Sequence, residues 1–336
     1  MKVLVVGTGS IGRRHIANLL ESGAIVEAFS YRGLDHGYHD RPGLTFVADL
    51  EAALDGDCDA VVVANRTDRH MTTAIAAARR GKAVFIEKPL SVSLAGSDEL
   101  LRLTRARSLV VEVGFMLRCH PNLLWIKRQL DEQVIGNLMH VHAYVGQWLP
   151  DWRPSTDHRT GYGAKRETGG GVIFDLIHEL DVVNWLCGPV EEVTAMTRRV
   201  PQLEIDTEAI AQVGLRLSSG ALAQVHLDYV RPSYARRLEV VGDKGVLSWD
   251  YTEGLVHFTS RDATRVAHRV PDGFERNSMF REHMRVFQER VFSNALPALS
   301  TLESAIATQR IALASHKSSA LGRHVRPDQI DADFAP

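Results

Sequence analysis

Met1-Lys-Val-Leu-Val-Val-Gly-Thr-Gly-Ser-Ile-Gly12 opens the chain, and this stretch decides the fold of its first part. The valine-rich run predicts a strand, and it leads directly into glycines at positions 7, 9 and 12. Helical spacing follows over residues 11–20, so the order is strand, G-x-G-x-x-G turn and helix, which is typical of a dinucleotide-binding βαβ unit. Gly7 permits the tight turn, Gly9 lets the backbone approach a diphosphate, and Gly12 lets helix and strand pack closely.

The free backbone N–H groups at the start of this helix predict where phosphates would bind. They include the groups of Ser10, Ile11 and Gly12, which lie at the positive end of the helix dipole. Glycine-rich turns also close ordinary corners between helices and strands, so the motif alone is weak. Its position directly after a strand and before a helix favours dinucleotide binding.

Composition limits the class of protein. The chain has 336 residues, more than a single hydrophobic core usually supports, so two domains are expected. Lys and Arg together number 39 and Asp and Glu 41, a balance that argues against a nucleic-acid-binding or membrane-surface protein. Apolar residues make up 45% of the chain, as in soluble globular proteins.

Targeting and cysteine patterns favour a cytoplasmic location. No stretch is long and apolar enough to span a bilayer, and the first strand leads into glycines rather than a signal-peptide cleavage site. Cys58, Cys119 and Cys187 are far apart and form no C-x-x-C pair, so neither a disulfide framework nor a metal site is expected.

Strands and helices alternate over the first third of the chain. Continuous apolar runs such as residues 60–64 are typical of a parallel sheet, whose strands are covered on both faces. The predicted strands lie at 25–30, 60–64, 83–86 and 109–115, and the predicted helices follow Asp49 and lie at 70–80 and 94–105. This alternation predicts a doubly wound parallel sheet, and we place its domain at residues 1–119.

The pattern changes after residue 120. Helices are predicted at 121–130, 174–186, 280–292 and 301–319, and strands at 138–147, 190–199, 209–217, 221–230, 237–241, 246–251 and 255–259. Short turns between consecutive strands indicate antiparallel pairing. The predicted fold class is therefore α/β: an N-terminal Rossmann dinucleotide-binding domain, then a C-terminal α+β domain over 120–330 with a large, mostly antiparallel open sheet. Residues 328–336 are expected to be a frayed tail.

Two later segments carry residues that suit an active site. Glu87-Lys88-Pro89 follows a parallel strand, at the edge where open α/β sheets bind their ligands. Gly169-Gly170-Gly171 precedes Asp175 and His178, which would share one face of the predicted helix. Together with the opening glycines, these segments resemble the Gfo/Idh/MocA family of nicotinamide-dependent oxidoreductases.

The resemblance extends along nearly the whole chain. It includes residues 64–70, Ala-Asn-Arg-Thr-Asp-Arg-His, and residues 114–118, Gly-Phe-Met-Leu-Arg, which lead into the second domain. The family commonly spaces its Asp and His positions four residues apart, whereas Asp175 and His178 are three apart.

The resemblance implies a reaction and the roles of three residues. Members bind NAD or NADP and move a hydride between the nicotinamide and a hydroxyl-bearing carbon, or ketone, of a sugar, inositol or related polyol. By this resemblance Lys88 polarises the reacting oxygen and helps relay its proton, His178 is the general acid/base, and Asp175 orients the substrate or tunes the histidine. These residue types suit the reaction, because a histidine can accept the hydroxyl proton near neutral pH and a cation stabilises developing alkoxide charge.

Further positions are assigned to the two ligands. We expect the cofactor to contact the glycine turn and three later segments, through Gly7, Gly9, Ser10, Ile11, Gly12, Ser30, Arg32, Asn65, His70, Glu87 and Lys88. We expect the substrate to contact Lys88, Arg118, Trp148, Arg159, Tyr162, Asp175 and His178. The polar and aromatic loop 148–168 would offer stacking and hydrogen bonds to a sugar-like molecule; the alternative is a partly ordered surface loop.

The end of the second strand bears on the choice between NAD and NADP. NAD-preferring folds usually place Asp or Glu there to bind the ribose hydroxyls, but this strand ends in Ala28-Phe29-Ser30-Tyr31-Arg32, and Glu27 comes too early. Ser30 can donate to a 2′-phosphate and Arg32 can bind it through a charge-assisted fork, so we predict NADP. The alternative is that Arg32 is a solvated cation and that either cofactor is accepted.

Three functions remain open at this point. The first is a dehydrogenase or reductase acting on a sugar, sugar derivative or cyclitol. The second is an NAD-dependent glycoside hydrolase, a class that resembles this family and works by transient oxidation, elimination, water addition and re-reduction. The third is a non-catalytic dinucleotide-binding regulator, against which the presence of Lys88, Asp175 and His178 argues.

A homo-oligomer, dimer or tetramer, is expected through the outer face of the second-domain sheet. Residues 221–230, ALAQVHLDYV, place apolar side chains on both faces, more than a solvated face tolerates. The expected partners are therefore a polyol or sugar-like small molecule and further copies of this chain, with no nucleic acid and no membrane.

Overall fold

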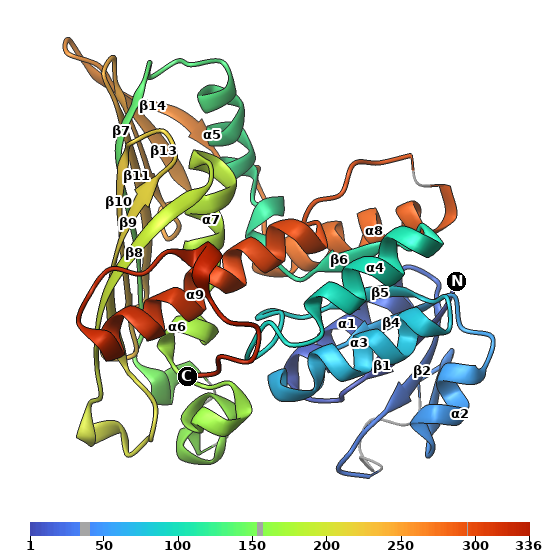
Figure 1. Ribbon diagram of the computed structural model, residues 1–336. Helices are drawn as coiled ribbons and strands as arrows, with labels where there is room; N and C mark the ends of the chain where they lie inside the picture. Colours follow the sequence, from blue (N-terminus) through green and yellow to red (C-terminus); the bar gives the residue numbers. More distant parts are fainter. Residues whose placement is uncertain (34–40, 153–156, 294) are drawn as a thin grey trace. The chain divides into compact units, whose positions relative to one another are not determined.

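The computed structural model describes residues 1–33, 41–152, 157–293 and 295–336, and these residues form two compact units (Figure 1). The first unit contains Met1–Cys119 and Glu275–Ile306, and the second contains His120–Phe274 and Ala307–Pro336. Within the described ranges, no helix has the length and hydropathy needed to cross a membrane.

A six-stranded parallel sheet forms the centre of the first unit. Its order is β3-β2-β1-β4-β5-β6, with β1 (Lys2–Val6), β2 (Ile25–Phe29), β3 (Leu44–Val47), β4 (Ala60–Val63), β5 (Ala83–Ile86) and β6 (Val111–Val113). Val3 lies opposite Val26 of β2 and Ala60 of β4, so β1 is central and the strand order reverses beside it. That reversal is the switch point at which open α/β sheets bind ligands, beyond the carboxyl ends of the strands. The predicted doubly wound sheet is confirmed.

Helices pack on this sheet, and consecutive residues of β1 are fully buried because both faces are covered. α3 (His70–Arg79) packs against β4, β5 and α4 (Ser97–Arg107). α1 (Ser10–Glu21) lies beside α8 (Arg276–Ser293). The short α2 (Leu50–Asp55) begins at Asp49, whose side chain accepts hydrogen bonds from its first turn, as predicted.

The position of α8 differs from the sequence prediction, which included it in the range of the second domain. Met284 and Phe287 of α8 share one core with Val3, Phe85 and Ile16 of the first unit. The helical pattern of this segment shows that it has a buried face, but it does not specify the sheet that this face covers.

An eight-stranded sheet forms the centre of the second unit (Figure 1). Its order is β14-β13-β12-β11-β7-β10-β9-β8, with β7 (Leu138–Gly146), β8 (Val190–Arg198), β9 (Ile210–Leu217), β10 (Leu222–Asp228), β11 (Ala235–Gly242), β12 (Val246–Asp250), β13 (Leu255–Thr259) and β14 (Thr264–Arg269). All neighbouring strands are antiparallel except β7 and β10, which confirms the predicted mostly antiparallel sheet. β3 and β14 were not predicted from the sequence.

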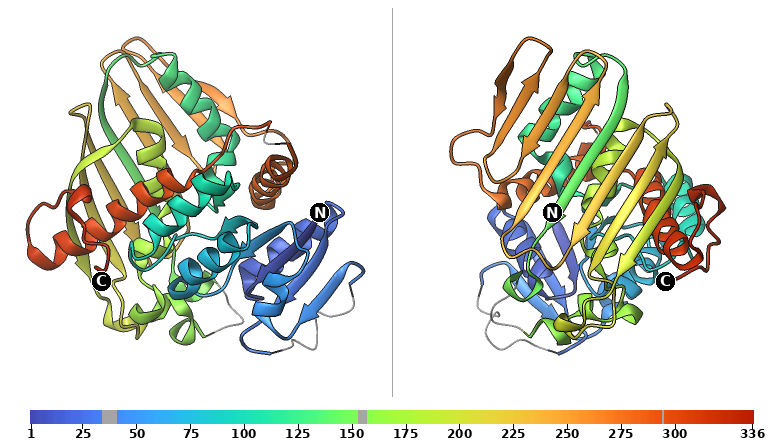
Figure 2. Two further views of the ribbon diagram at one scale, coloured as in Figure 1. Left: turned by 45° about the vertical axis from the view of Figure 1, so that its right-hand side comes forward. Right: turned by 90° about the vertical axis from the view of Figure 1, so that its left-hand side faces the viewer.

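Helices cover one face of the eight-stranded sheet, and Figure 2 (right) shows its other face, which carries no helix among the described residues of this unit. The helices are α5 (Pro121–Asp131), α6 (Val172–Asp175), α7 (His178–Cys187) and α9 (Leu302–Leu321), the last of which contributes Ala307 onward to this unit. Short 3-10 helices, including η3 (Leu149–Trp152), η4 (His158–Thr160), η6 (Arg166–Thr168) and η7 (Pro201–Leu203), follow β7 and β8.

Three local predictions were wrong. The single helix expected over 174–186 is two helices, because Leu176 leaves helical geometry at φ −103° and ψ 26° and ends α6. β10 does not have two apolar faces: Ala223, Val225 and Leu227 are buried, while the opposite face carries Gln224, His226 and Asp228 beside an exposed Leu222. The expected frayed tail packs instead, since Ile330 is buried and Asp331 pairs with Lys317.

Candidate functional site

The glycine turn after β1 leaves space at one glycine and none at the other two. Gly7 has φ +109°, and a Cβ there would lie 2.4 Å from the carbonyl oxygen of Ala64. A Cβ at Gly12 would lie 1.9 Å from the carbonyl oxygen of Gly7, whereas a Cβ at Gly9 would meet no atom of the described part of the chain within 4 Å. The close packing therefore requires glycine at 7 and 12, and the open position at Gly9 fits the approach of a ligand.

Helix α1 presents its first N–H groups at this open position. Gly9 is the N-cap, no side chain of the described residues caps the helix, and the N–H of Arg13 donates to the Gly9 carbonyl oxygen at 2.9 Å. The preceding N–H groups of Ser10, Ile11 and Gly12 lie in the first turn, where an α-helix has no internal acceptor for them. A helix start of this kind suits a diphosphate, so these residues fit the predicted dinucleotide.

Two arginines lie near the end of β2. The guanidinium of Arg69 lies over the ring of Tyr31, 4.3 Å from its centroid, and Ser30 accepts a hydrogen bond from the N–H of Arg32 at 3.3 Å. Within the described residues, neither Arg32 nor Arg69 has a carboxylate partner. The nearest acid in the strand, Glu27, instead pairs with the Lys2 amine at 3.0 Å. The sequence prediction missed Arg69, because only the fold brings the loop after β4 to the end of β2.

The predicted cofactor residues Asn65 and His70 contact each other, and His70 also contacts the Glu87-Lys88-Pro89 segment. The two ring nitrogens of His70 lie 2.9 Å from the carbonyl oxygen of Pro89 and 3.1 Å from that of Asn65. The Asn65 amide donates to the Thr73 hydroxyl at 3.0 Å. Burial lowers the pKa of His70, and the neutral ring has a single N–H to donate to one of these two carbonyl oxygens. The ring thereby links the loop after β4 to the end of β5.

Glu87 and Lys88 lie at the carboxyl end of β5. The buried Glu87 carboxylate lies 2.6 Å from Nε2 of His15 on α1, and it accepts the backbone N–H of Lys88 at 3.2 Å. Burial opposes ionisation of Glu87, but His15 and Lys88 outweigh it, so the pKa of this carboxyl lies below its usual value. The sequence prediction gave His15 no role; its signal was its position beside Ile16 on the buried face of the helix.

Asp175 and His178 lie in the second unit, at the end of α6 and the start of α7. Both are buried, and the Asp175 carboxylate accepts a hydrogen bond from the Tyr229 hydroxyl at 2.8 Å. Tyr229 is fully buried and packs edge-on against Trp152, so its hydroxyl is held in place. Tyr229 was not predicted as a site residue, because it joins Asp175 only through the pairing of distant strands.

Glu208 holds the glycine turn that precedes α6. Its carboxylate accepts the backbone N–H of Ile173 at 3.2 Å, and a Cβ at Gly171, where φ is +107°, would lie 2.3 Å from Glu208 Oε1. Burial raises the pKa of Glu208 to about 7. Nε2 of His316, whose side chain is 9% exposed, lies 4.0 Å from Glu208 Oε1, and burial lowers the pKa of this histidine to about 3.

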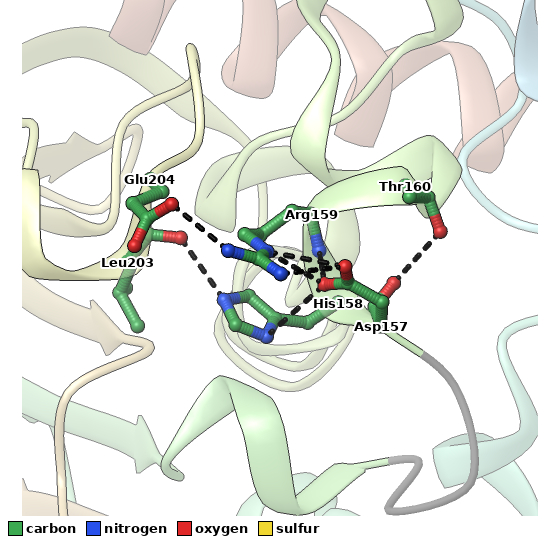
Figure 3. A network of polar contacts seen from close by, with 6 residues as sticks. All are labelled: Asp157, His158, Arg159, Thr160, Leu203 and Glu204. Atoms are coloured by element: carbon green, nitrogen blue, oxygen red, sulfur yellow. Dashed lines mark hydrogen bonds and ion pairs between the residues drawn. The ribbon is translucent and has the colours of Figure 1, made fainter.

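Among the remaining predicted substrate residues, Arg118 and Arg159 have partners within their own units. Arg118 is buried and donates to the Leu299 carbonyl at 3.0 Å and to the Ser304 hydroxyl at 2.6 Å. Trp148 is half-buried, and the side chain of Tyr162 lies outside the described part of the structure. The guanidinium of Arg159 contacts the carboxylates of Asp157 at 2.9 Å and Glu204 at 3.0 Å (Figure 3).

The Arg159 contacts join η4 to the residues after η7. His158 strengthens this junction, because its Nε2 lies 3.0 Å from the carbonyl oxygen of Leu203 (Figure 3). These exposed contacts show that Arg159 links two loop segments of the second unit. Its contact with a substrate stays a prediction. Within the described ranges, no group of His, Cys, Asp and Glu residues is arranged to hold a metal ion.

Comparison with known proteins identifies relatives of both parts of the chain. A model described as "Oxidoreductase family, NAD-binding Rossmann fold" matches residues 1–115, and one described as "GFO/IDH/MocA C-terminal domain" matches residues 123–248. The myo-inositol 2-dehydrogenase of Thermotoga maritima is 28% identical, over 98% of this chain and 99% of that protein. The inositol 2-dehydrogenase of Acidiphilium cryptum is 30% identical, over 74% of this chain and 73% of that protein.

A solved structure shares the fold. Levoglucosan dehydrogenase, in a complex with NADH and L-sorbose, matches with a TM-score of 0.86 over 98% of this chain and 99% of that one. The identity is 18%, so this likeness concerns the fold.

Proposed function

Because this chain belongs to the GFO/IDH/MocA family of oxidoreductases, we propose that it transfers a hydride between NAD(P) and a hydroxyl-bearing carbon of a sugar, sugar derivative or cyclitol. The observation that carries the proposal is the arrangement at one sheet edge of the first unit. A helix start open at Gly9 and a lysine at position 88 both follow strands of the same parallel sheet. The names of the two inositol dehydrogenase relatives support a cyclitol or sugar-like substrate.

The residues of the chain divide the work of this reaction. The bound cofactor supplies the hydride acceptor or donor. The N–H groups of Ser10, Ile11 and Gly12 bind its diphosphate, and the Lys88 ammonium stabilises negative charge that develops on the reacting oxygen. His178 accepts or returns the hydroxyl proton, and Asp175, held by the Tyr229 hydroxyl, orients the substrate or the histidine.

We infer a preference for NADP from the end of β2. Ser30, Arg32 and Arg69 offer a hydroxyl and two cations there, which suit a 2′-phosphate. Glu27, the carboxylate that would repel this phosphate, pairs with Lys2 near the start of β1.

We also propose that the chain assembles as a homodimer or homotetramer. The support is the sheet face on which the structure describes no helix of the second unit (Figure 2). Met196 and Leu222 on this face are 74% and 54% exposed. The first unit, Met1–Cys119 with Glu275–Ile306, would then serve as the cofactor domain, and the second, His120–Phe274 with Ala307–Pro336, as the domain for substrate and assembly. Light scattering at micromolar concentration tests the assembly, and a monomer would contradict it.

A substrate panel tests the reaction. The purified protein is incubated with NAD or NADP and with myo-inositol, other cyclitols and common sugars, and absorbance at the nicotinamide band is followed. We expect reduction of the cofactor with at least one member of the panel. Turnover of a glycoside with bound cofactor and no net reduction would instead support the hydrolase, and cofactor binding with no turnover of any kind would support a regulator.

A further inference from the structure

Two buried histidines of the first unit contact the segment that carries Lys88. His15, from α1, contacts the Glu87 carboxylate at 2.6 Å, and His70, from the start of α3, lies 2.9 Å from the Pro89 carbonyl oxygen. The residues on both sides of Lys88 are thus tied to helices that begin at the sheet edge where the cofactor would bind.

The His15–Glu87 contact is the stronger of the two ties. The side chains are 1% and 7% exposed, and the lowered pKa of Glu87 keeps it ionised. Within the described residues, Nδ1 of His15 has no hydrogen-bond partner, so Glu87 receives the polar interaction of this ring. A buried carboxylate is costly unless it is paired, and short charge-assisted contacts of this kind fix geometry.

Glu87 uses its two oxygens for different partners. Oε1 binds His15, and Oε2 accepts the backbone N–H of Lys88 at 3.2 Å. A Cβ at Gly114 would lie 3.0 Å from the carboxyl group, so the backbone packs closely against it and leaves little room for movement. The carboxylate therefore joins the helix that starts at the glycine turn to the main chain of Lys88.

A second buried pair in the same unit provides a reference. Nε2 of His283 on α8 lies 3.4 Å from the Glu112 carboxylate of β6. Both His15 and His283 pack edge-on against the ring of Phe85, with distances between ring centroids of 5.2 and 5.0 Å. Glu112 binds Arg290 and the backbone N–H of Ser300, so this pair holds α8, whereas Glu87 holds the backbone N–H of Lys88. The two pairs match in burial and packing, and they differ in what the carboxylate holds.

We propose that the His15–Glu87 pair positions Lys88 relative to the cofactor, by fixing the backbone of Lys88 to the helix that binds the diphosphate. This inference rests on the proposed role of Lys88 in the reaction. His15 and Glu87 touch neither reacting group, so they are positioning residues, and their loss changes turnover more than it changes cofactor affinity. Displacement of a reacting group by about 1 Å can cost a hundredfold in rate.

The test compares four variants of the full chain. In His15→Leu the pair is lost, and we expect kcat to fall tenfold or more while the Kd for NADPH or NADH stays within threefold. In His15→Gln an amide N–H can again reach Glu87, and most of the lost kcat returns. His283→Leu is the matched control, with a similar loss of thermal stability and kcat within threefold of wild type. His15→Asn, too short to reach Glu87, replaces His15→Leu if that variant does not fold.

A second measurement needs no substrate. Hydrogen exchange of a peptide covering residues 86–90 should become tenfold faster in His15→Leu and stay unchanged in His283→Leu, because only the first variant releases the Lys88 N–H. Unchanged exchange and unchanged kcat in His15→Leu would overturn the proposal, as would an equal loss of kcat in His283→Leu. Lys88→Met separates the two hypotheses: if it retains full turnover, the proposed role of Lys88 is wrong, whatever His15 does.

Discussion

Two glycine turns, at residues 7–12 and 169–171, precede the two segments that carry the predicted catalytic residues, and different neighbours restrict them. The first is restricted by backbone, since a Cβ at Gly12 would lie 1.9 Å from the carbonyl oxygen of Gly7. The second is restricted by a side chain, since a Cβ at Gly171 would lie 2.3 Å from the carboxylate of Glu208.

The difference explains why one turn is easy to recognise in a sequence and the other is not. Gly7 and Gly12 restrict each other within one short motif, so the spacing of the glycines carries the geometry. Gly171 depends on a buried carboxylate far along the chain, and only the pairing of β9 into the sheet brings Glu208 to it. Rigid turns at both places nevertheless serve the same end, because both hold a backbone close to a predicted reacting group.

The largest effect on turnover is expected at Lys88. Its backbone N–H donates to Glu87, which contacts His15 on α1, the helix that follows the first turn. Lys88→Met should lower turnover by roughly two to four orders of magnitude, the scale of losing a group that handles a proton or stabilises charge. Cofactor affinity should stay within a few fold, which fluorescence titration with NADPH and NADH measures. Lys82→Met, at a half-buried lysine that donates to the Gly56 carbonyl, is the control and should retain turnover. A near-normal rate in Lys88→Met would contradict the assigned role.

Alanine at Gly12 and at Gly9 separates packing from ligand approach within the first turn. Gly12→Ala should lower the free energy of unfolding by about 3 kcal/mol or more, because its methyl group meets a backbone carbonyl that cannot move aside. Gly9→Ala should change stability by less than about 1 kcal/mol, since its methyl group enters open space, yet weaken cofactor binding tenfold or more. Urea unfolding and cofactor titration measure both effects. Equal stability losses in the two variants would show that the turn is not packed as described.

Glu208 makes stability pH-dependent near the second turn. Its carboxyl has a pKa of about 7 in the folded chain against an ordinary value of 4.5, so the folded state binds the proton more tightly than the unfolded state. The protonated Glu208 carboxyl therefore contributes fully to the free energy of unfolding below pH 4.5. This free energy falls by about 3 kcal/mol as the pH rises through 7. Urea unfolding at pH 5 and pH 8 should show this fall in the wild type but not in Glu208→Gln. Glu191→Gln, at an exposed position, is the control, and a pH dependence that survives in Glu208→Gln would assign it to another group.

A double substitution tests whether the second turn is restricted by a side chain. Gly171→Ala should cost about 2 kcal/mol, from the strain of a positive φ and from contact with Glu208. Glu208→Ala should relieve the contact but not the strain, so the two substitutions together should cost less than the sum of their separate effects. Additive losses would mean that Glu208 does not restrict Gly171.

The sequence alone predicts the parts of this molecule that depend on neighbours in the chain. The predicted family, the fold class and the enzyme class, a dehydrogenase or reductase acting on CH–OH groups, are confirmed. The glycine turn and the apolar strands β1 and β4 could be recognised because their patterns are local. β3 has four residues and no alternation of buried and exposed side chains, so it leaves no such pattern.

The contacts of the candidate site could not be predicted in this way. The pairs His15–Glu87 and Tyr229–Asp175 join residues that are distant in the chain. A sequence pattern describes single positions and does not show which distant residues are in contact. The break at Leu176 between α6 and α7 also left no signal, because an apolar residue with good helical propensity occupies it.

The smallest effect is expected at the end of β2, where a tenfold preference corresponds to about 1.4 kcal/mol. Arg32 and Arg69 lie beside Ser30 and Tyr31 with no carboxylate partner among the described residues, so both are available to a 2′-phosphate. Calorimetry should show that the wild type binds NADPH about tenfold more tightly than NADH. Arg32→Ala should lose most of this preference for NADPH. Arg69→Ala should lose part of it, because the variant removes one of the two cations and also frees the Tyr31 ring that this guanidinium covers. Arg66→Ala is the control, since Arg66 is paired with Asp68, and it should leave the preference within twofold. A tenfold preference of the wild type for NADH would overturn the NADP assignment and would identify these arginines as solvated cations.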